Sequence, residues 1–237
     1  MKIVAIICTY NAVETIANCL QSLSGKVDEI IILDGRWIGV EGTSLHSIDG
    51  TIEKIIECSK IITPEIKLIM AKDLSNQVDS RNYLISLIPE GDWFLIIDSD
   101  ERITKWDGVK ETLETTPNIG FRIRLCGTDE SFKGMPMPQP RIMLKTKDVH
   151  YTTNHRYMAN MDGEIKAGDD LPVISITVKH EGESKSMRPV IEKYKGWLLK
   201  WEQVNADYLK DYKDWRAKKD IPTKKDIDEM TNTETLK

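Results

Sequence analysis

Two aspartates separated by a single residue, Asp98 and Asp100, directly follow the apolar run Trp93–Ile97. If strand geometry continues through them, their carboxylates project to the same side and repel each other. A hard divalent cation held by oxygen ligands relieves this repulsion, and its other side can hold the diphosphate of a nucleotide. The plain alternative is an acidic strand end that water solvates.

Other polar residues stand at comparable points of the chain. The segment Cys8-Thr9-Tyr10-Asn11 ends the first apolar run, Asp34-Gly35 ends the second, and Arg81 precedes the fourth. An aspartate after the second strand can accept hydrogen bonds from a base or ribose, and an arginine can pair with phosphate. Each also has an ordinary structural explanation: a strand-to-helix turn with a cap, a common turn pair and a surface ion pair. Their order along the chain favours one shared site.

The elements that must position these residues alternate between strand and helix, which predicts an α/β fold with a parallel sheet. Continuous apolar runs are typical of strands buried on both faces, and they occur at Lys2–Cys8, Glu29–Leu33, Lys67–Met70 and Trp93–Ile97. Helices are expected from Asn11, as an N-cap with Glu14 three residues later, to Gly25, and over Thr51–Ser59 and Ser75–Leu87. In such sheets ligands bind beyond the carboxyl ends of the strands, where the polar residues above lie.

The pattern is less regular after Glu101. Three prolines within Met135–Pro140 predict an extended, non-helical loop. A long helix with aromatic residues along one side is expected from Pro189, followed by a polar tail. Further strands are expected at Gly120–Leu125, Arg141–Leu144 and Ile174–Lys179.

Composition excludes several classes of protein. The chain has 237 residues with 40% hydrophobic and 30% charged residues, which is ordinary for a globular protein. Its net charge of −5 argues against a nucleic-acid partner. No apolar run reaches the length of a membrane span, and no cleavage site follows the first strand, so neither a membrane-spanning nor a secreted protein is expected. Four widely spaced cysteines form neither a disulfide framework nor a zinc site and fit a reducing cytoplasm.

On these residues the chain resembles a family-2 glycosyltransferase of the GT-A fold, nearest to the short enzymes similar to lipopolysaccharide-core glucosyltransferases. The resemblance implies a mainly parallel α/β sheet flanked by helices, to which the helix expected from Pro189 adds a C-terminal extension. It is specific over residues 2–103, the expected nucleotide-sugar half, weak over the acceptor half at 104–186, and absent from the helix and tail at 187–237. The matching stretches are Ile6–Asn11, Asp28–Gly35, Asp79–Asn82 and Gly91–Arg102.

The resemblance implies donor-binding roles by position. Thr9 and Tyr10 would line the base pocket, and Asp34 would hold the base or ribose. Arg81 would contact the base or diphosphate, and Asp98 would bind ribose or the donor sugar. The full expected donor-binding set is Thr9, Tyr10, Asn11, Asp34, Arg81, Asp98 and Ser99.

The resemblance also implies a Mn²⁺ or Mg²⁺ ion that bridges the diphosphate. Asp100 would coordinate it, with Asp98 beside it. A histidine from a late strand often completes this shell, and His180 falls where that residue would stand. A satisfied surface histidine is the alternative for His180.

The catalytic base is the least defined part of the expected site. An inverting transferase needs a carboxylate to accept the proton of the acceptor hydroxyl, while the metal takes up charge on the leaving diphosphate. Short relatives often carry a His-Glu pair, where this chain has His155-Arg156, an acceptor-side pair without a carboxylate. The segment Gly168-Asp169-Asp170-Leu171 loosely resembles the acidic motif that carries the base in longer relatives, so the resemblance makes Asp170 or Asp169 the first candidate. A solvated turn is the structural alternative. Glu164 and Glu181 follow.

The expected function is metal-dependent transfer of a sugar from a UDP-, GDP- or dTDP-linked donor to a hydroxyl of a glycan, a lipid-linked saccharide or a protein. A non-catalytic module that binds a nucleotide or sugar is the alternative, since a base is missing at His155-Arg156. A nucleotidyltransferase or a dinucleotide enzyme would need a glycine-rich loop after the first strand, and Thr9–Ala12 is not one. The aromatic stripe of the expected helix at 188–215 fits a docking face, a homodimer contact or a peripheral contact with the inner face of the membrane.

Overall fold

A computed structural model describes residues 1–37, 44–71, 76–127, 137–151, 158–160, 163–165 and 171–181. These residues belong to one compact unit that spans Met1–Ile38 and Gly42–Gly182. The expected base residues Asp169 and Asp170, the pair His155-Arg156 and the expected helix at 188–215 lie outside the described residues. No helix in the described part is long and apolar enough to cross a bilayer.

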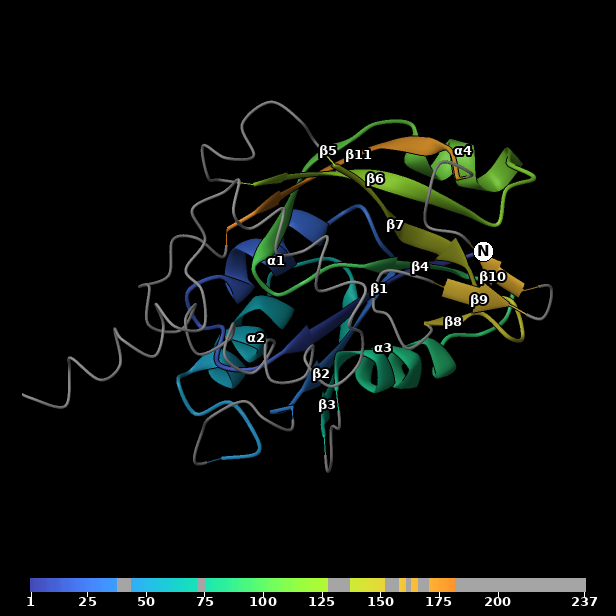
Figure 1. The fold of residues 1–237 in the computed structure, drawn as a ribbon. Helices are drawn as coiled ribbons and strands as arrows, with labels where there is room; N and C mark the ends of the chain where they lie inside the picture. Colours follow the sequence, from blue (N-terminus) through green and yellow to red (C-terminus); the bar gives the residue numbers. More distant parts are fainter. Residues whose placement is uncertain are drawn as a thin grey trace, which may run out of the picture. The chain divides into compact units, whose positions relative to one another are not determined.

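An eight-stranded mixed sheet forms the centre of this unit (Figure 1). Its first four strands run parallel to one another in the order β3, β2, β1, β4. Beyond β4 the strands are β7, β6, β11 and β5, of which only the pair β6 and β11 is parallel. The strands are β1 (Ile3–Thr9), β2 (Glu29–Asp34), β3 (Glu65–Met70), β4 (Trp93–Ile96), β5 (Glu101–Trp106), β6 (Gly120–Gly127), β7 (Met137–Leu144) and β11 (Val173–His180).

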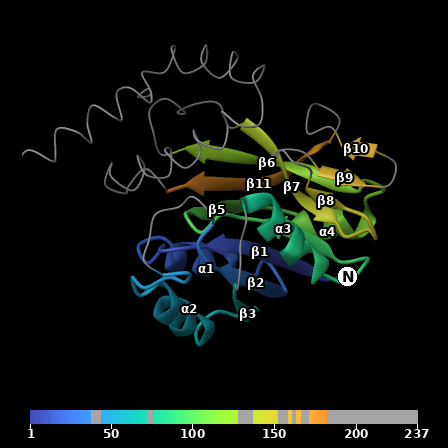
Figure 2. The same ribbon diagram turned by 60° about the horizontal axis from the view of Figure 1, so that its bottom comes forward.

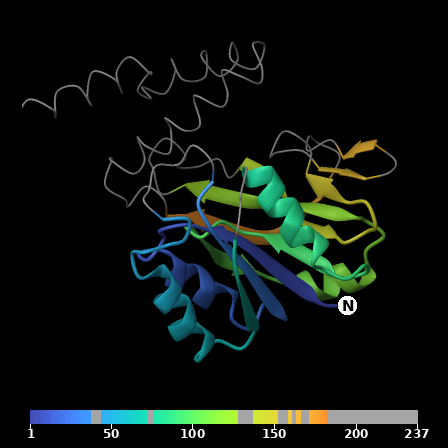
Figure 3. The same ribbon diagram turned by 90° about the horizontal axis from the view of Figure 1, so that it is seen from below.

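Helices cover both faces of the sheet, as Figures 2 and 3 show for α1 and α2 against α3. The helices α1 (Ile16–Leu23), α2 (Thr51–Ser59) and α4 (Val109–Thr115) pack on one face, and α3 (Gln77–Ser86) packs on the other. This layering confirms the expected α/β architecture with a mainly parallel sheet.

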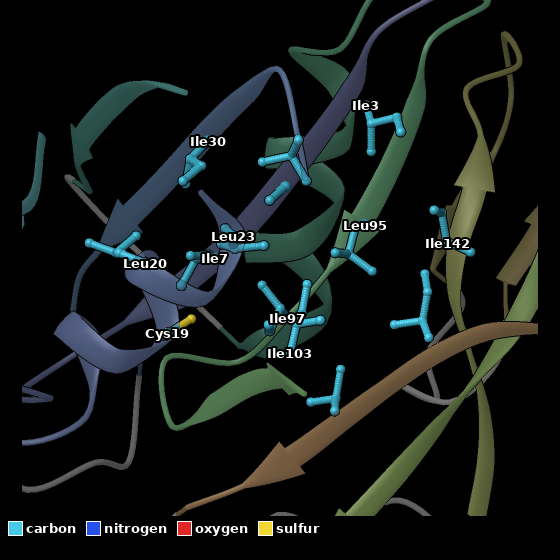
Figure 4. Packing of buried hydrophobic residues seen from close by; sticks show 14 of the residues in the cluster. Ile3, Ile7, Cys19, Leu20, Leu23, Ile30, Leu95, Ile97, Ile103 and Ile142 are labelled. Atoms are coloured by element: carbon cyan, nitrogen blue, oxygen red, sulfur yellow. The ribbon is translucent and has the colours of Figure 1, made fainter. Parts of the chain in front are cut away.

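The face under α1 carries the larger apolar core (Figure 4). Leu20 and Leu23 of α1 pack against Ile7 of β1, and all three side chains are fully buried. Alternate residues of β1 serve the two faces, so Ile3, Ala5 and Ile7 belong to this cluster while Val4 and Ile6 belong to the one under α3. Burial on both faces explains why the strand reads as an unbroken apolar run.

The expected strands of the first half are confirmed to within two residues at each end, and α2 has the expected bounds. The expected cap at Asn11 is wrong, because α1 begins only at Ile16 with Thr15 before it. Asn11 instead has a left-handed backbone with φ 48°, which asparagine tolerates better than most residues. Its side-chain oxygen accepts a hydrogen bond from the backbone N–H of Ile48 at 3.1 Å rather than from a helix.

The second half differs more from expectation. Part of the proline-rich segment expected as a loop is strand β7, which begins at Met137. Pro140 lies where the β6–β7 register is irregular, between Phe121 and Arg122, and the pairing of β4 with β7 covers only residues 142–144, so neither Pro138 nor Pro140 interrupts that ladder. Strand β5 and helix α4 were not expected, nor was a small sheet of β8 (His150–Tyr151), β9 (Met158–Asn160) and β10 (Gly163–Ile165).

Strands β4 and β5 are consecutive in the chain, yet β7, β6 and β11 lie between them in the sheet. In a flat sheet four inter-strand steps would separate them by roughly 19 Å. The link between them contains a turn in which Glu101 N–H donates to Asp98 O at 2.9 Å. Such a turn holds its ends within about 7 Å. This half of the sheet must therefore curl, and the turn that carries both aspartates joins its two sides.

Candidate functional site

The carboxyl ends of β1, β2 and β4 bring the expected site residues to one edge of the sheet. Thr9 lies beside Asp34 in the register of β1 and β2. Asp98 follows two residues after β4, which pairs with β1 on its other side. The parallel arrangement therefore gathers residues that lie far apart in the sequence, as expected.

Asp98 lies over two arginines. Its Oδ1 accepts a hydrogen bond from Arg81 Nη2 of α3 at 2.6 Å, and its Oδ2 is 3.4 Å from Arg141 Nη2 of β7. The two arginine side chains are 4% and 9% exposed, whereas the Asp98 side chain is 29% exposed. Asp98 is thus the part of this cluster that reaches the surface. The expected contact of Arg81 with a base or diphosphate stays a prediction, because the arginine lies beneath the aspartate.

Glu101 completes the cluster from below. Its Oε1 lies 3.2 Å from Arg141 Nη2, and its Oε2 accepts the backbone N–H of Asp98 at 2.8 Å. The Glu101 side chain is 1% exposed, and this burial raises its pKa although Arg141 opposes the rise. Two carboxylates and two guanidinium groups therefore balance one another in a buried network.

Tyr151 of β8 closes the network on the side of α3. Its ring lies under the Arg81 guanidinium, which is 5.3 Å from the ring centre. Burial is the largest single influence on Arg81 and lowers its pKa, but the Asp98 carboxylate together with Tyr151 and Cys8 outweighs it, so the pKa is raised. Burial also raises the pKa of Tyr151. The side chain of Asn82, next to Arg81, binds the backbone N–H and C=O of Tyr151 at 2.6 and 2.9 Å.

Asp100 takes a different direction from Asp98. Strand β4 ends at Ile96 and residues 99 and 100 form a turn, so the strand alternation that would put both carboxylates on one side does not continue. The Asp100 Oδ2 atom lies 3.6 Å from His180 Nε2 at the end of β11. His180, the residue expected beside Asp100, therefore lies next to it in the structure.

The pair of Asp100 and His180 fits a divalent cation as two of its ligands. Two ligands bonded at about 2.1 Å and at right angles to each other lie about 3 Å apart, so the two atoms, 3.6 Å apart here, would have to move closer to hold one ion. The described residues hold no group of three or more His, Cys, Asp or Glu side chains suited to a metal. A Mg²⁺-type ion commonly binds one or two protein groups and completes its shell with water and substrate phosphates.

Asp34 is fully buried, and its carboxylate accepts hydrogen bonds from the loop that follows β2. Its Oδ1 accepts the Ser47 hydroxyl, its Oδ2 accepts the Ser47 backbone N–H at 3.0 Å, and His46 Nδ1 lies 3.6 Å from Oδ2. In this structure the carboxylate thus holds residues 46 and 47, and its expected contact with a base or ribose stays a prediction.

The segment after β1 holds the same loop. Tyr10 donates from its hydroxyl to the Ser44 carbonyl at 3.1 Å, and the Asn11 N–H donates to Ser47 Oγ at 2.8 Å. The Ala12 N–H donates to Thr51 Oγ1 at 2.7 Å. These contacts support the structural explanation of the Thr-Tyr-Asn segment as a turn. Thr9 differs from its neighbours, because its Oγ1 is buried without a hydrogen-bond partner among the described residues.

Of the four base candidates, only the side chain of Glu181 is described. Arg102 Nε lies 2.6 Å from its Oε1, and the Asn18 amide donates to its Oε2 at 3.1 Å. Both carboxylate oxygens of Glu181 therefore have partners in this structure. Glu164 lies in β10, where only the backbone is described.

Three residues of the network were not in the expected donor-binding or metal-binding sets: Glu101, Arg141 and Tyr151. The sequence holds a signal for two of them, since Glu101 follows Asp98 at the three-residue spacing of a turn and Arg141 directly precedes the apolar residues Ile142–Leu144. Ser47 was also missed, and no periodic pattern surrounds it.

A cavity of about 330 Å³ lies elsewhere, between the last turn of α3 and the connection from β7 to β8. Lys145 lines it, and its backbone pairs with Gly91 and Asp92 ahead of β4, at the opposite end of that strand from Asp98. The Lys145 ammonium already donates to the Thr146 carbonyl at 2.8 Å, and Asp148 lines the same space. We assign no chemistry to this cavity.

No family model and no curated protein matches this chain. Among solved structures it is similar to TarS 1-349 of S. aureus in complex with UDP-GlcNAc, with 21% identity over 58% of this chain and 37% of that chain and a TM-score of 0.45. It is also similar to the mannosyltransferase PcManGT of Pyrobaculum calidifontis in complex with GDP-Man and Mn²⁺, with 15% identity, 55% and 37% coverage and a TM-score of 0.42.

A third similar structure is glucosyl-3-phosphoglycerate synthase of Mycobacterium tuberculosis with Mn²⁺, UDP and phosphoglyceric acid, at 16% identity, 55% and 44% coverage and a TM-score of 0.37. The chain spans less than half the length of each of these three structures. Because all three TM-scores are below 0.5, these likenesses assign neither a family nor a reaction to this chain.

Proposed function

We propose that this chain is a metal-dependent glycosyltransferase of the GT-A type that moves a sugar from a nucleoside-diphosphate donor to a hydroxyl acceptor. One observation carries the proposal: the turn after β4 directs Asp98 onto two buried arginines and Asp100 toward His180, at the carboxyl edge of parallel strands. The resemblance of residues 2–103 to family-2 glycosyltransferases supports it.

The setting of Asp98 suits a hydrogen-bond acceptor for a hydroxyl group. Arg81 and Arg141 offset its charge and hold it in one orientation, while its side chain stays 29% exposed. A ribose or sugar hydroxyl is a neutral donor that fits such a group.

The setting of Asp100 suits a cation. Asp100 and His180 would hold Mn²⁺ or Mg²⁺, which, when bound, stabilises the negative charge on the leaving diphosphate. Asp98 would keep the donor sugar in place through its hydroxyl groups. A carboxylate of the acceptor half, with Asp170 and Asp169 as candidates, would accept the acceptor's proton in a single inverting displacement.

Calorimetric titration of UDP, GDP and dTDP, each with and without Mn²⁺, tests this proposal. One nucleotide should bind in a metal-dependent way. Asp100→Asn should abolish that dependence, because it removes the charge at the cation. Asp107→Asn is the matched control, since Asp107 is an exposed aspartate paired with Lys105. Loss of binding in both variants, or in neither, would contradict the metal assignment.

Turnover separates the transferase from the alternative, a module that only binds. Release of the nucleoside diphosphate from its sugar conjugate, in the presence of Mn²⁺, should accompany binding in a transferase. Binding without release would favour the non-catalytic module. If none of the three nucleotides binds to the folded protein, both the transferase and the nucleotide-binding module are refuted.

A further inference from the structure

We propose that Glu101 and Arg141 are positioning residues that fix the turn from Asp98 to Glu101 and thereby the direction of the Asp98 carboxylate. The role in donor binding rests on the proposed function, whereas the role in fixing the turn can be tested without it. Neither residue has a role in the donor-binding or metal-binding sets expected from the sequence.

Two reciprocal hydrogen bonds close the turn from Asp98 to Glu101. The Glu101 N–H donates to the Asp98 carbonyl at 2.9 Å, and the Asp98 N–H donates to Glu101 Oε2 at 2.8 Å. A turn held only by its backbone bond leaves its first N–H to water. Here the Glu101 side chain binds that N–H as well, which ties both ends of the turn together.

Arg141 bridges the carboxylates of Asp98 and Glu101. Its Nη2 lies 3.2 Å from Glu101 Oε1 and 3.4 Å from Asp98 Oδ2, so one guanidinium contacts both carboxylates. Arg141 stands next to Ile142, which pairs with Leu95 in the centre of the sheet. The guanidinium therefore starts from a fixed strand. Its planar fork can reach two carboxylates at once, which a lysine ammonium on a flexible stem does less well.

Both Glu101 and Arg141 are buried beneath Asp98. The side chains of Glu101 and Arg141 are 1% and 9% exposed, so a ligand at the surface reaches Asp98 before either of them. Their effect on a ligand must therefore pass through Asp98. This distinguishes positioning residues from residues that touch the ligand.

A double-mutant cycle tests the donor-binding role, with UDP, GDP and dTDP plus Mn²⁺ as probes and temperatures far below each variant's unfolding midpoint. Arg141→Met should weaken nucleotide binding about tenfold, the scale of one charge-assisted hydrogen bond. Arg141→Lys should recover part of the loss, and it carries the test if the Met variant does not fold. In an Asp98→Asn background the same changes should have no further effect, whereas additive losses would overturn the proposal.

Amide hydrogen exchange tests, independently of nucleotide binding, whether the two residues fix the turn. Glu101→Gln and Arg141→Lys should both speed exchange at the Asp98 amide. Glu29→Gln is the matched control, because Glu29 is a buried carboxylate that pairs with Lys67 at the other end of the sheet. Unchanged protection at Asp98 would overturn the proposal. If no nucleotide binds the wild-type protein, the proposed function fails, and the exchange result still decides whether the two residues fix the turn.

Discussion

Replacement of Ser47 by alanine should lower the free energy of unfolding by about 2 kcal/mol. The Ser47 hydroxyl joins two strand ends, since it donates to Asp34 Oδ1 and accepts the Asn11 N–H. Asp34 is completely buried, and the loss of a hydrogen bond to a buried charged group costs about 1.5–3 kcal/mol. Asn11 is exposed, so water can replace the bond to its N–H, and the Ser47 backbone bond to Asp34 Oδ2 remains.

Urea and thermal unfolding, followed by circular dichroism, measure this loss. A domain of about 150–250 residues loses about 2–4 °C of Tm per kcal/mol, so a drop of roughly 4–8 °C is expected. Ser47→Thr keeps a hydroxyl and should lose less. Ser59→Ala is the control, because the Ser59 hydroxyl binds only the Ile56 carbonyl on an exposed helix end, and its effect should stay within about 0.5 kcal/mol. If Ser47→Ala behaved like Ser59→Ala, the reasoning that the hydroxyl stabilises a buried carboxylate would be refuted.

Three other changes give distinct expectations. Tyr151→Phe keeps the ring under Arg81, whereas Tyr151→Leu should cost about 0.5–2 kcal/mol more in urea unfolding through the lost cation–π contact, and equal losses would contradict it. Because burial raises the Tyr151 pKa, its contribution to stability is complete below the unfolded value of about 10 and is lost as pH rises through the folded value. Wild type should therefore lose more stability than Tyr151→Phe between pH 8 and pH 11, and parallel curves would speak against this. Gly120→Ala should cost about 1–3 kcal/mol, since a Cβ there would lie 2.7 Å from Met143 Cε and closer still to its Sδ, and Met143 is fully buried, which limits how far its side chain can move aside. Additivity with Met143→Ala would show that this contact is not the cause.

The local sequence pattern was sufficient to predict much of the fold. The apolar runs of β1, β2 and β4 are unbroken because both faces of these strands are covered, and the sequence shows this directly. The helix α2 has its expected bounds because its apolar spacing and its flanking residues agree. The proximity of Asp100 and His180 was also expected, but only through the resemblance to a family.

The remaining features depend on partners distant in sequence. Asp34 binds Ser47, thirteen residues later in a loop without periodicity, so the pattern around Asp34 could not show that its carboxylate is occupied. Strand β5 has a mixed polar sequence and pairs with β11 far along the chain. Arg141 meets Glu101 across forty residues. Such contacts follow from how the sheet curls, which local propensity does not encode.

The order of strands also sets the order of events during biosynthesis. Within the described part of the chain, β5 pairs only with β11, which begins at Val173. At about 5–20 residues per second, a ribosome needs roughly 4–16 s to pass from residue 100 to residue 180. Through that interval β5 is an unpaired edge open to other strands, a hazard that chaperones commonly limit. Asp100 meets His180 only when β11 has joined the sheet, so a nascent chain cannot bring these two side chains together before residue 180 has been synthesised.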